Sequence, residues 1–334
     1  MRGLKRYYRL IFLFLIITSL IFPSLLAHVP NVSEGNESLE TATHIHDPTK
    51  SWAIYSELHE GREAQYYELE LEEGERLKTN LYIPDKNGFV PSIVVMGPDI
   101  DEHDDIPDFI ETVEGSGHKL IEGELEEPEY EPFTPASYYY LAEYDVTVNE
   151  SGSYYIAVFD EESGGKYGLA IGAEERYGLI EWIRVPIDVV QVHRWEGQPW
   201  ITIFAPLIIV LIGGFSLIYW KDKKEDLIDN YRGWLAVTAG FLYIGTGGMT
   251  IMQMTIASMK ANPGASIILT ITFSVLPILL GIAIIKKGLK IEERMTRDKR
   301  ITLLIYGALG FFVWAGLIVG PILTILDSVL PSKR

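Results

Sequence analysis

The sequence predicts two joined parts: an extracytoplasmic antiparallel β-sandwich of jelly-roll type, followed by a bundle of four transmembrane helices. Three observations support this. The first part alternates apolar and acidic side chains, a period of two that is typical of half-buried strands. The second part contains four apolar runs of about 20 residues, the length that crosses a bilayer. Charge divides at the same place, since residues 28–199 hold 38 of the 46 acidic side chains and 10 of the 28 basic ones.

The chain begins with a basic and then an apolar segment. Basic residues cluster at 2–9, and the apolar run at 10–22 is shorter than the roughly 20 residues of a comfortable span. The small residue Ala27 follows. Residues 1–27 are therefore predicted to be either a removed signal peptide or a retained signal anchor. Both alternatives place the following domain outside the cytoplasm.

Residues 28–176 have the pattern of a sandwich domain. In the stretch EAQYYELELEEGERL, Tyr67, Leu69 and Leu71 share one face of an expected strand. The opposite face carries tyrosine and glutamate and is expected to be solvated. Such charged side chains also discourage edge-to-edge aggregation of sheets.

Two hairpins are expected in this domain. The turn EEGER should join a strand at 63–71 to a hydrogen-bonded partner at 77–83. The stretch GSYYIAVFDEESGGKYGLAIG should form another hairpin that turns at Gly164 and Gly165. Short strands with regular turn signals favour an antiparallel sandwich.

Three stretches resemble a known family. ESLETATHI, GREAQYYELELEEGERLKTNL and NESGSYYIAVFDEESGGKYGLAIG are similar in order and spacing to the pre-peptidase C-terminal (PPC-like) domain, over roughly residues 36–174. The resemblance implies a jelly-roll-like, usually non-catalytic domain that serves binding or stability. The sequence departs from the family pattern in an acidic insertion at 99–140 and in Glu63-Ala-Gln, where the family commonly has Asp-x-Asp. The sandwich followed by spans also resembles archaeal membrane proteins of unknown function.

The second part, 201–327, contains the expected spans, followed by a short tail at 328–334. The loops at 221–232 and 286–300 are rich in lysine and arginine, which predicts that both are cytoplasmic and that the acidic domain is outside. The predicted spans are Ile201–Trp220, Trp234–Ala257, Ser266–Ile285 and Ile301–Leu326. Aromatic residues are expected at the two membrane interfaces: Trp195, Trp200, Tyr219, Trp220 and Trp234.

The spans contain no acidic, basic or histidine side chain in their interiors, and Asp327 lies at an end. Pumps, ion channels and membrane haem proteins need such groups, so these functions are disfavoured. Gly316 and Gly320 have the spacing at which helices approach closely. They are expected to serve either packing within the bundle or contact with another membrane subunit.

The segment 177–200 joins the two parts. Ile180, Ile183, Ile187 and Val190 are expected to form an apolar stripe on a helix interrupted by Pro186. The segment is too polar to span a bilayer. It is expected to lie on the outer leaflet or against the bundle and to hold the domain near the membrane.

Two groups of side chains are candidate metal ligands. Carboxylates around His103 have a spacing that suits Ca²⁺, although the EF-hand pattern is absent; they are Asp99, Asp101 and Asp105. His44 and His46 lie on one face of an extended segment and suit Cu²⁺. Removal of residues 1–27 would add the amine and imidazole of His28.

The sequence favours a membrane-anchored, non-enzymatic surface protein whose sandwich binds or scaffolds an extracytoplasmic partner. The alternatives are an accessory subunit of a larger membrane complex and a copper-binding protein. Its expected partners are membrane lipid and a membrane or surface protein, while the acidic domain disfavours nucleic acid. No cofactor is expected apart from the candidate Ca²⁺ or Cu²⁺. The absence of cysteine excludes thiol catalysis and disulfides.

Overall fold

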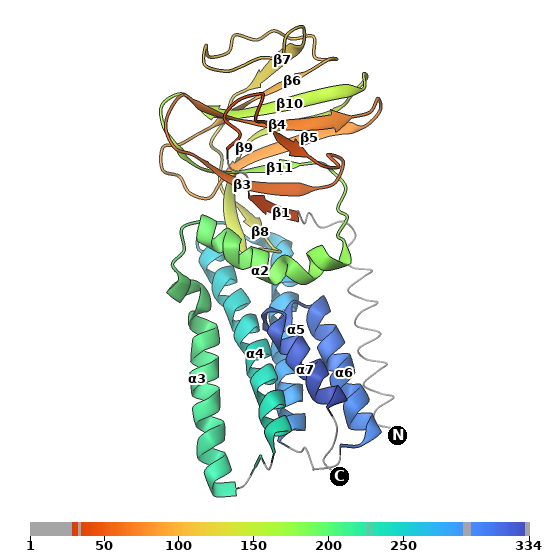
Figure 1. Cartoon of the computed structure of the whole chain (residues 1–334). Coiled ribbons are helices and arrows are strands. Elements are labelled where there is room, and N and C mark those ends of the chain that lie inside the picture. The colour runs from red at the N-terminus through yellow and green to blue at the C-terminus, as the bar shows by residue number, and fades with distance from the viewer. Residues whose placement is uncertain (1–28, 33–34, 226, 229, 290–294, 331–334) are drawn as a thin grey trace.

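The computed structural model describes residues 29–32, 35–225, 227–228, 230–289 and 295–330. Figure 1 shows a β domain at one end, a group of helices at the other, and one helix lying across the boundary between them. The predicted two-part organisation of a β-sandwich domain and apolar helices is confirmed. The predicted segment 1–27 and His28 lie outside the described residues.

Two sheets form the β domain. The sheet nearer the helices has the order β1-β3-β11-β5-β9-β8, and the distal sheet has the order β2-β4-β10-β6-β7 (Figure 1). The strands are β1 (Val29–Val32), β2 (Thr43–Ile45), β3 (Trp52–Leu58), β4 (Glu63–Leu71), β5 (Arg76–Ile83), β6 (Ser92–Gly97), β7 (Gly117–Ile121), β8 (Glu129–Glu131), β9 (Ala136–Thr147), β10 (Gly152–Asp160) and β11 (Gly165–Ile171).

The pairing is antiparallel except at two sheet edges. Among the described pairs, β1 with β3 and β2 with β4 are parallel. The core between the sheets contains the expected inward face of β4, where Tyr67, Leu69 and Leu71 are almost completely buried. Tyr67 and Tyr167 meet there through their hydroxyl groups, 2.6 Å apart. The predicted period of two thus correctly identifies the core-facing side chains.

The two predicted hairpins are wrong. β4 and β5 lie in different sheets, and so do β10 and β11. The chain crosses between the sheets at each of these turns. The turn between β10 and β11 packs closely against the turn between β3 and β4. A Cβ atom on Gly61 would lie 2.6 Å from the backbone of Glu162, and one on Gly164 would lie 2.5 Å from that of His59. Alternation identifies a strand but not its hydrogen-bonded partner, because every strand of a sandwich has one inward face.

The outer face of β4 is not fully solvated, contrary to expectation. Tyr66 is 1% exposed, because the segment after β6 folds over it. The backbone N–H of Glu111 donates to the Tyr66 hydroxyl at 2.8 Å, and Ile110 and Phe109 pack nearby. The acidic insertion therefore has an apolar side that covers the distal sheet, while its charged side chains face outward.

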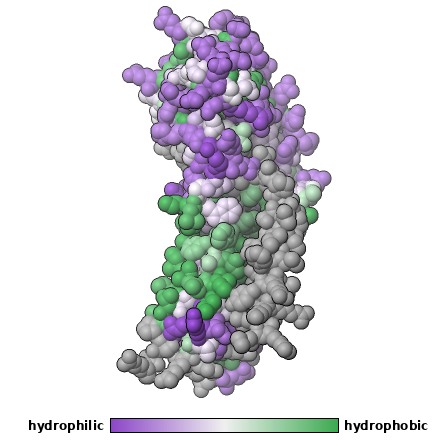
Figure 2. Space-filling model, turned by 90° about the vertical axis from the view of Figure 1, so that its right-hand side faces the viewer, coloured by the Kyte–Doolittle hydropathy of each residue, from purple (hydrophilic) through white to green (hydrophobic). Residues whose placement is uncertain are grey.

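The helical part contains three helices that are long and apolar enough to span a membrane. Lengths of 22 to 28 residues correspond to about 33–42 Å, against a hydrocarbon core of about 30 Å. The described helices are α2 (Leu179–Trp195), α3 (Trp200–Glu225), α4 (Tyr231–Ser258), η1 (Gly264–Ser266), α5 (Ile267–Gly288), α6 (Arg297–Phe312), η2 (Ala315–Leu317) and α7 (Val319–Val329). Their surface forms an apolar band beneath the polar β domain (Figure 2).

The fourth predicted span is not confirmed. The stretch 301–326 is divided into α6 and α7, which turn back on each other through η2. Gly307 of α6 contacts Ile325 of α7, and Arg300 donates to the carbonyl of Ser328, so the two helices are antiparallel. At about 24 and 16 Å, neither helix is long enough to cross the hydrocarbon core. The described C-terminal residues consequently lie at the end far from the β domain (Figure 1).

The turn between α6 and α7 has an unusual backbone. Trp314, Leu317 and Ile318 have φ angles of 52°, 49° and 66°. Positive φ is rare for residues other than glycine and strained for a β-branched one. Such a turn has to be stabilised by its surroundings.

The prediction that Gly316 and Gly320 lie on one helix is wrong. Gly316 lies in η2 with φ 70°, and Gly320 lies in the first turn of α7. Both approach Tyr243 of α4, because Cβ atoms there would lie 3.0 and 2.7 Å from its ring. Their close contact is with this chain's own bundle.

A seam of glycines also joins α4 and α5. Cβ atoms on Gly240 and Gly281 would lie 2.7 and 2.5 Å from each other's carbonyl oxygens. About two turns away on either side, Gly233 faces Gly288 in the same way, and Gly247 faces the carbonyl of Ser274. Small residues let backbones approach closely, which favours helix association in a membrane, where hydrophobic burial contributes little.

An ion pair closes the end of the bundle far from the β domain. Arg232, at the start of α4, donates to Asp327 of α7 at 2.9 Å, and the two side chains are 5% and 0% exposed. Removal of one partner of a buried pair is destabilising. The pair therefore links α7 to α4 at the opposite end from the turn.

The glycine seam leads to a prediction. Gly281→Ala should lower the free energy of unfolding by about 1–3 kcal/mol, because the new Cβ collides with the carbonyl of Gly240. Gly213→Ala, in α3, is the matched control: its Cβ meets nothing within 4 Å, so stability should be unchanged or slightly higher. Thermal unfolding in detergent measures both, and equal effects would contradict the seam.

Candidate functional site

The candidate site is the junction, which we define as the layer formed by α2, the β8–β9 loop and the ends of α4, α5 and the α6–α7 turn nearest the β domain. α2 lies across the helices and beneath the sheet that is nearer to them (Figure 1). Cavities and aromatic side chains from all these elements converge there.

α2 is placed as expected, but its buried face differs from the predicted stripe. Val192 and His193 are buried, whereas Ile180 and Ile187 are 74% and 44% exposed. The exposed isoleucines form an apolar edge suited to a membrane surface. Trp195, expected in the lipid interface, instead contacts Tyr55 of the sandwich at 4.8 Å between ring centroids.

Pro186 does not interrupt α2, which continues on both sides of it. Proline has no N–H, so the carbonyl of Trp182, four residues earlier, loses its helical donor. Trp314 supplies the replacement, since its Nε1–H donates to that carbonyl at 3.0 Å. The gap in the α2 hydrogen-bond ladder is thereby filled by the tip of the α6–α7 turn.

Trp314 is also the centre of an aromatic cluster. Its ring stacks on Phe273 of α5 at 4.5 Å and contacts Trp182 at 4.8 Å. Phe133, from the β8–β9 loop, lies 6.2 Å from both Trp314 and Phe273. The cluster therefore connects the sandwich, α2, the bundle and the strained turn.

Polar contacts reinforce the junction. The Tyr130 hydroxyl donates to Thr270 of α5, whose own hydroxyl donates to the carbonyl of Pro132, both at 2.8 Å. Other links are Trp195 Nε1 to the Ser56 carbonyl, the Tyr138 hydroxyl to Glu196, and Gln198 to Gln253. Because most of these groups are at least half-buried, the sandwich is fixed on the helices.

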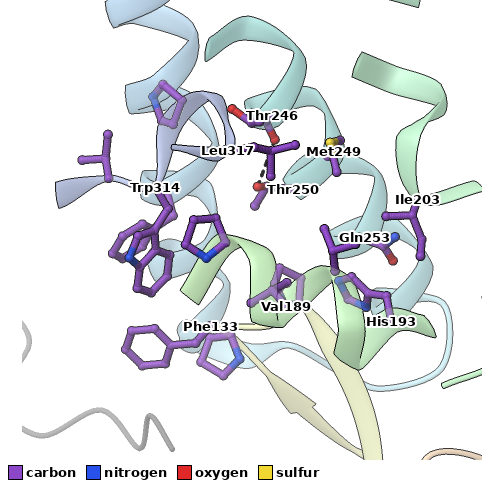
Figure 3. Close-up of a pocket in the computed structure, with 17 residues that line it drawn as sticks. Phe133, Val189, His193, Ile203, Thr246, Met249, Thr250, Gln253, Trp314 and Leu317 are labelled. Carbon is purple, nitrogen blue, oxygen red and sulfur yellow. Dashed lines mark hydrogen bonds between the residues drawn. The ribbon is translucent and has the colours of Figure 1, made fainter. Parts of the chain in front are cut away.

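The apolar cavity of the junction has a volume of about 70 Å³. Phe133, Val189, Met249 and Leu317 face it from four different elements (Figure 3). His193 also lines it and is 2% exposed, with Nδ1 held 2.9 Å from Glu196. The cavity walls are thus mainly apolar, with polar groups on the α2 and α4 sides.

A second, smaller cavity, which we call the tyrosine cage, has a volume of about 30 Å³. It shares Phe133, Val189 and Trp314 with the apolar cavity. Its walls carry one carboxylate, Glu131, and five tyrosines: Tyr55, Tyr82, Tyr138, Tyr140 and Tyr177. The cage combines aromatic faces with a single negative charge.

The carboxyl group of Glu131 is strongly perturbed by its surroundings in the cage. Burial raises its pKa from 4.5 to about 7, and neighbouring Glu175 adds to the shift. The Phe133 backbone N–H donates to its Oε1 at 3.0 Å and opposes the shift only in part. Burial raises the pKa of Tyr55, Tyr140 and Tyr177, and the charge of Glu131 adds to that shift.

An acidic cavity of about 430 Å³ adjoins the cage and shares Glu131 and Tyr140 with it. Further carboxylates line it, opposed by Lys78: Glu126, Glu129 and Glu143. Asn80 lines it too, and no hydrogen-bond donor among the described residues reaches its buried Oδ1. The acidic cavity thus presents acceptors in excess of donors.

The predicted copper ligands lie elsewhere, on the distal sheet. His44 is in β2 and His46 follows it, with ring centroids 4.9 Å apart and both side chains exposed. His44 Nδ1 lies 3.5 Å from Glu68. The structure brings this pair together, but among the described residues no group of three or more His, Asp or Glu side chains is placed to hold a metal ion. Copper binding stays a prediction.

The predicted calcium ligands do not converge. Asp99 accepts hydrogen bonds at 2.6 Å from the Tyr154 hydroxyl and the Asn149 backbone, so it anchors the β9–β10 turn. Asp101 and Asp105 are exposed, and His103 packs against His118 with centroids 5.3 Å apart. Calcium binding likewise stays a prediction.

Sequence reasoning missed the junction residues. Phe133, Trp314 and His193 come from three distant segments, and nothing in their local sequence marks them as neighbours. Two residues could have indicated the junction. Pro186 in a helical pattern leaves a carbonyl without its helical donor, and Trp314 in an apolar run needs a partner for its indole N–H.

Comparison with known proteins adds nothing to this geometry: no protein-family model and no curated protein matches the chain.

The Trp314–Trp182 hydrogen bond gives a testable prediction. Trp314→Phe keeps an aromatic ring but removes the donor, and should destabilise the fold by about 1–3 kcal/mol, because the partly buried carbonyl of Trp182 is left without a donor. Pro186→Ala restores an N–H to the helix, so Trp314→Phe should cost less in that background. Additive effects in this double-mutant cycle, followed by thermal unfolding, would contradict the assignment.

A further prediction concerns pH. Since the Glu131 pKa is about 7 in the fold against 4.5 unfolded, the folded state binds the extra proton between these values. Stability should therefore fall as pH rises from about 5 to 8, by about 1–3 kcal/mol from this group. Glu131→Gln should reduce the slope, measured as melting temperature at several pH values. Glu129→Gln, an exposed position on the same strand, should leave it unchanged; an unchanged slope in Glu131→Gln would contradict the assignment.

Proposed function

We propose that the protein is a membrane-anchored, non-enzymatic surface protein whose β-sandwich binds or scaffolds an extracytoplasmic partner. The observation that supports this most directly is the rigid junction. A domain held by an aromatic cluster and buried hydrogen bonds presents its far surface in a fixed orientation above the membrane, as a scaffold requires.

The surface available to a partner is acidic. The distal sheet and the segment between β6 and β7, which covers part of it, lie at the end away from the helices (Figure 1), and this end is polar (Figure 2). Its exposed carboxylates include Asp101, Asp105, Asp108 and Glu114. We infer a partner with a basic surface, whose approach to this field would be accelerated at low salt.

The orientation belongs to the same proposal. The loops 221–232 and 286–300 carry the excess of basic residues, and their described residues lie at the far end of the helices, so the positive-inside rule favours a cytoplasmic position for them. Exposed Trp200 at one end of α3 and exposed Tyr219 and Trp220 at the other suit the two interfaces.

The alternative of an accessory membrane subunit now rests on α3. The glycines that suggested it contact this chain's own helices, as described above. Only 17% of the apolar stretch of α3 that could cross a membrane is buried against the rest of the chain. Ile208, Ile209 and Ile212 are exposed. A partner helix would have to use this surface, which lipid also fits.

Because the chain has no cysteine, single cysteines can locate the partner. Asp101→Cys at the distal end should react with a membrane-impermeant thiol crosslinker on intact cells and yield one defined adduct. Lys286→Cys, at the opposite end, should remain unlabelled until the cells are opened. An adduct formed only by Ile209→Cys with a lipid-soluble crosslinker would favour the subunit alternative, and labelling of Lys286→Cys on intact cells would contradict the orientation.

A further inference from the structure

The tyrosine cage has no role in the scaffold proposed above, yet it combines features that are costly to bury. Glu131 is half-buried, and the one hydrogen bond that its carboxylate accepts from a described residue comes from the Phe133 backbone. Among the described residues, the neighbouring charge that raises its pKa beyond the effect of burial is the carboxylate of Glu175, and no base opposes this shift. A desolvated carboxylate without a cationic partner is unfavourable, so a cation that enters the cage would be bound strongly.

The cage walls suit a particular kind of cation. Tyr82 lies 4.9 Å from Tyr138, 5.5 Å from Tyr140 and 6.4 Å from Tyr55 between ring centroids, so the four rings form a continuous aromatic surface. Aromatic faces attract organic ammonium ions through the ring quadrupole, and cages of such rings recognise quaternary ammonium groups. A strongly hydrated metal ion would gain little from these walls.

We propose that the tyrosine cage and Glu131 form a binding site for an alkylammonium group. The group occupies the cage of about 30 Å³, and the remainder of the ligand lies in the acidic cavity of about 430 Å³, with which the cage shares Glu131 and Tyr140. The larger cavity is within the usual size of small-molecule sites, about 300–1,000 Å³.

The acidic cavity has the polarity that such a ligand requires. Its carboxylates outnumber its one base, Lys78, and the unpartnered Asn80 Oδ1 can accept a hydrogen bond from the ligand. Two sources of the group fit the position at the edge of the helices: a soluble ammonium compound, and the headgroup of a membrane lipid.

The site also touches the rest of the junction. Phe133 and Trp314 form the wall between the cage and the apolar cavity, and the backbone of Phe133 holds the Glu131 carboxylate. A bound cation would keep Glu131 ionised and would press on the same two rings that stabilise the α6–α7 turn.

The test uses the full-length chain in a detergent without amine groups, titrated with choline by calorimetry. Choline should bind with 1:1 stoichiometry, and its neutral isostere 3,3-dimethylbutan-1-ol should bind at least about tenfold more weakly, because it lacks the charge. Sodium chloride at the same ionic strength serves as the salt control. Equal binding of the alcohol, or an equal heat with the salt, would overturn the proposal.

Variants identify the site. Glu131→Gln should weaken choline binding by about tenfold or more, whereas Glu127→Gln, an exposed position that lines neither the cage nor the acidic cavity, should change it by less than about threefold. Tyr140→Phe should retain binding, and Tyr140→Leu should weaken it about 3- to 30-fold. The Tyr140 pair keeps the test valid if Glu131→Gln fails to fold. Unchanged binding in both Glu131→Gln and Tyr140→Leu would place the ligand elsewhere.

Nanodiscs distinguish the two sources. Phosphatidylcholine nanodiscs should compete with added choline if a lipid headgroup enters the cage, whereas phosphatidylglycerol nanodiscs should not. Equal choline affinity in both would identify a soluble ligand. The crosslinking result at Asp101 is independent of this site, so failure of either proposal leaves the other standing.

Discussion

The hydrogen bond from Trp314 to the carbonyl of Trp182 is the interaction on which the arrangement of the two halves depends. Pro186 leaves that carbonyl without a helical donor, and the indole that fills the gap comes from the tip of the α6–α7 turn. The same ring stacks on Phe273 and contacts Phe133. One side chain therefore positions α2, the bundle and the sandwich relative to one another.

The α6–α7 turn illustrates how strain is held in a membrane bundle. Left-handed backbone at non-glycine residues costs about 1–3 kcal/mol each, and such residues persist only where neighbours over-determine them. Here the tip is held by the aromatic cluster, and the far end of α7 is held by the Arg232–Asp327 pair. Between the two, the backbone of the turn and α7 rests on the ring of Tyr243 through Gly316 and Gly320.

The junction also connects the two proposals made for this protein. A fixed sandwich suits a scaffold. Where the sheet packs on the crossed helices, the two surfaces do not fill the space between them completely, and cavities remain. The cage lies in this layer, beside the rings that hold the turn, and the acidic cavity adjoins it within the β domain. A ligand there would contact Phe133 and Trp314, two of the rings that join the β domain to the helices.

The sequence by itself determined the two-part organisation, the inward face of β4 and the position of three helices that are long and apolar enough to span a membrane, because these depend on local periodicity and on the length of apolar runs. Only the tertiary structure decided which strands pair, since every sandwich strand has one inward face whichever sheet it joins. It also decided that 301–326 turns back on itself, because composition measures the apolarity of that stretch but not the contacts of Trp314 and Tyr243. The cage was beyond sequence reasoning for the same reason: Glu131, Tyr82 and Tyr177 become neighbours only when β8, β5 and the segment before α2 pack together.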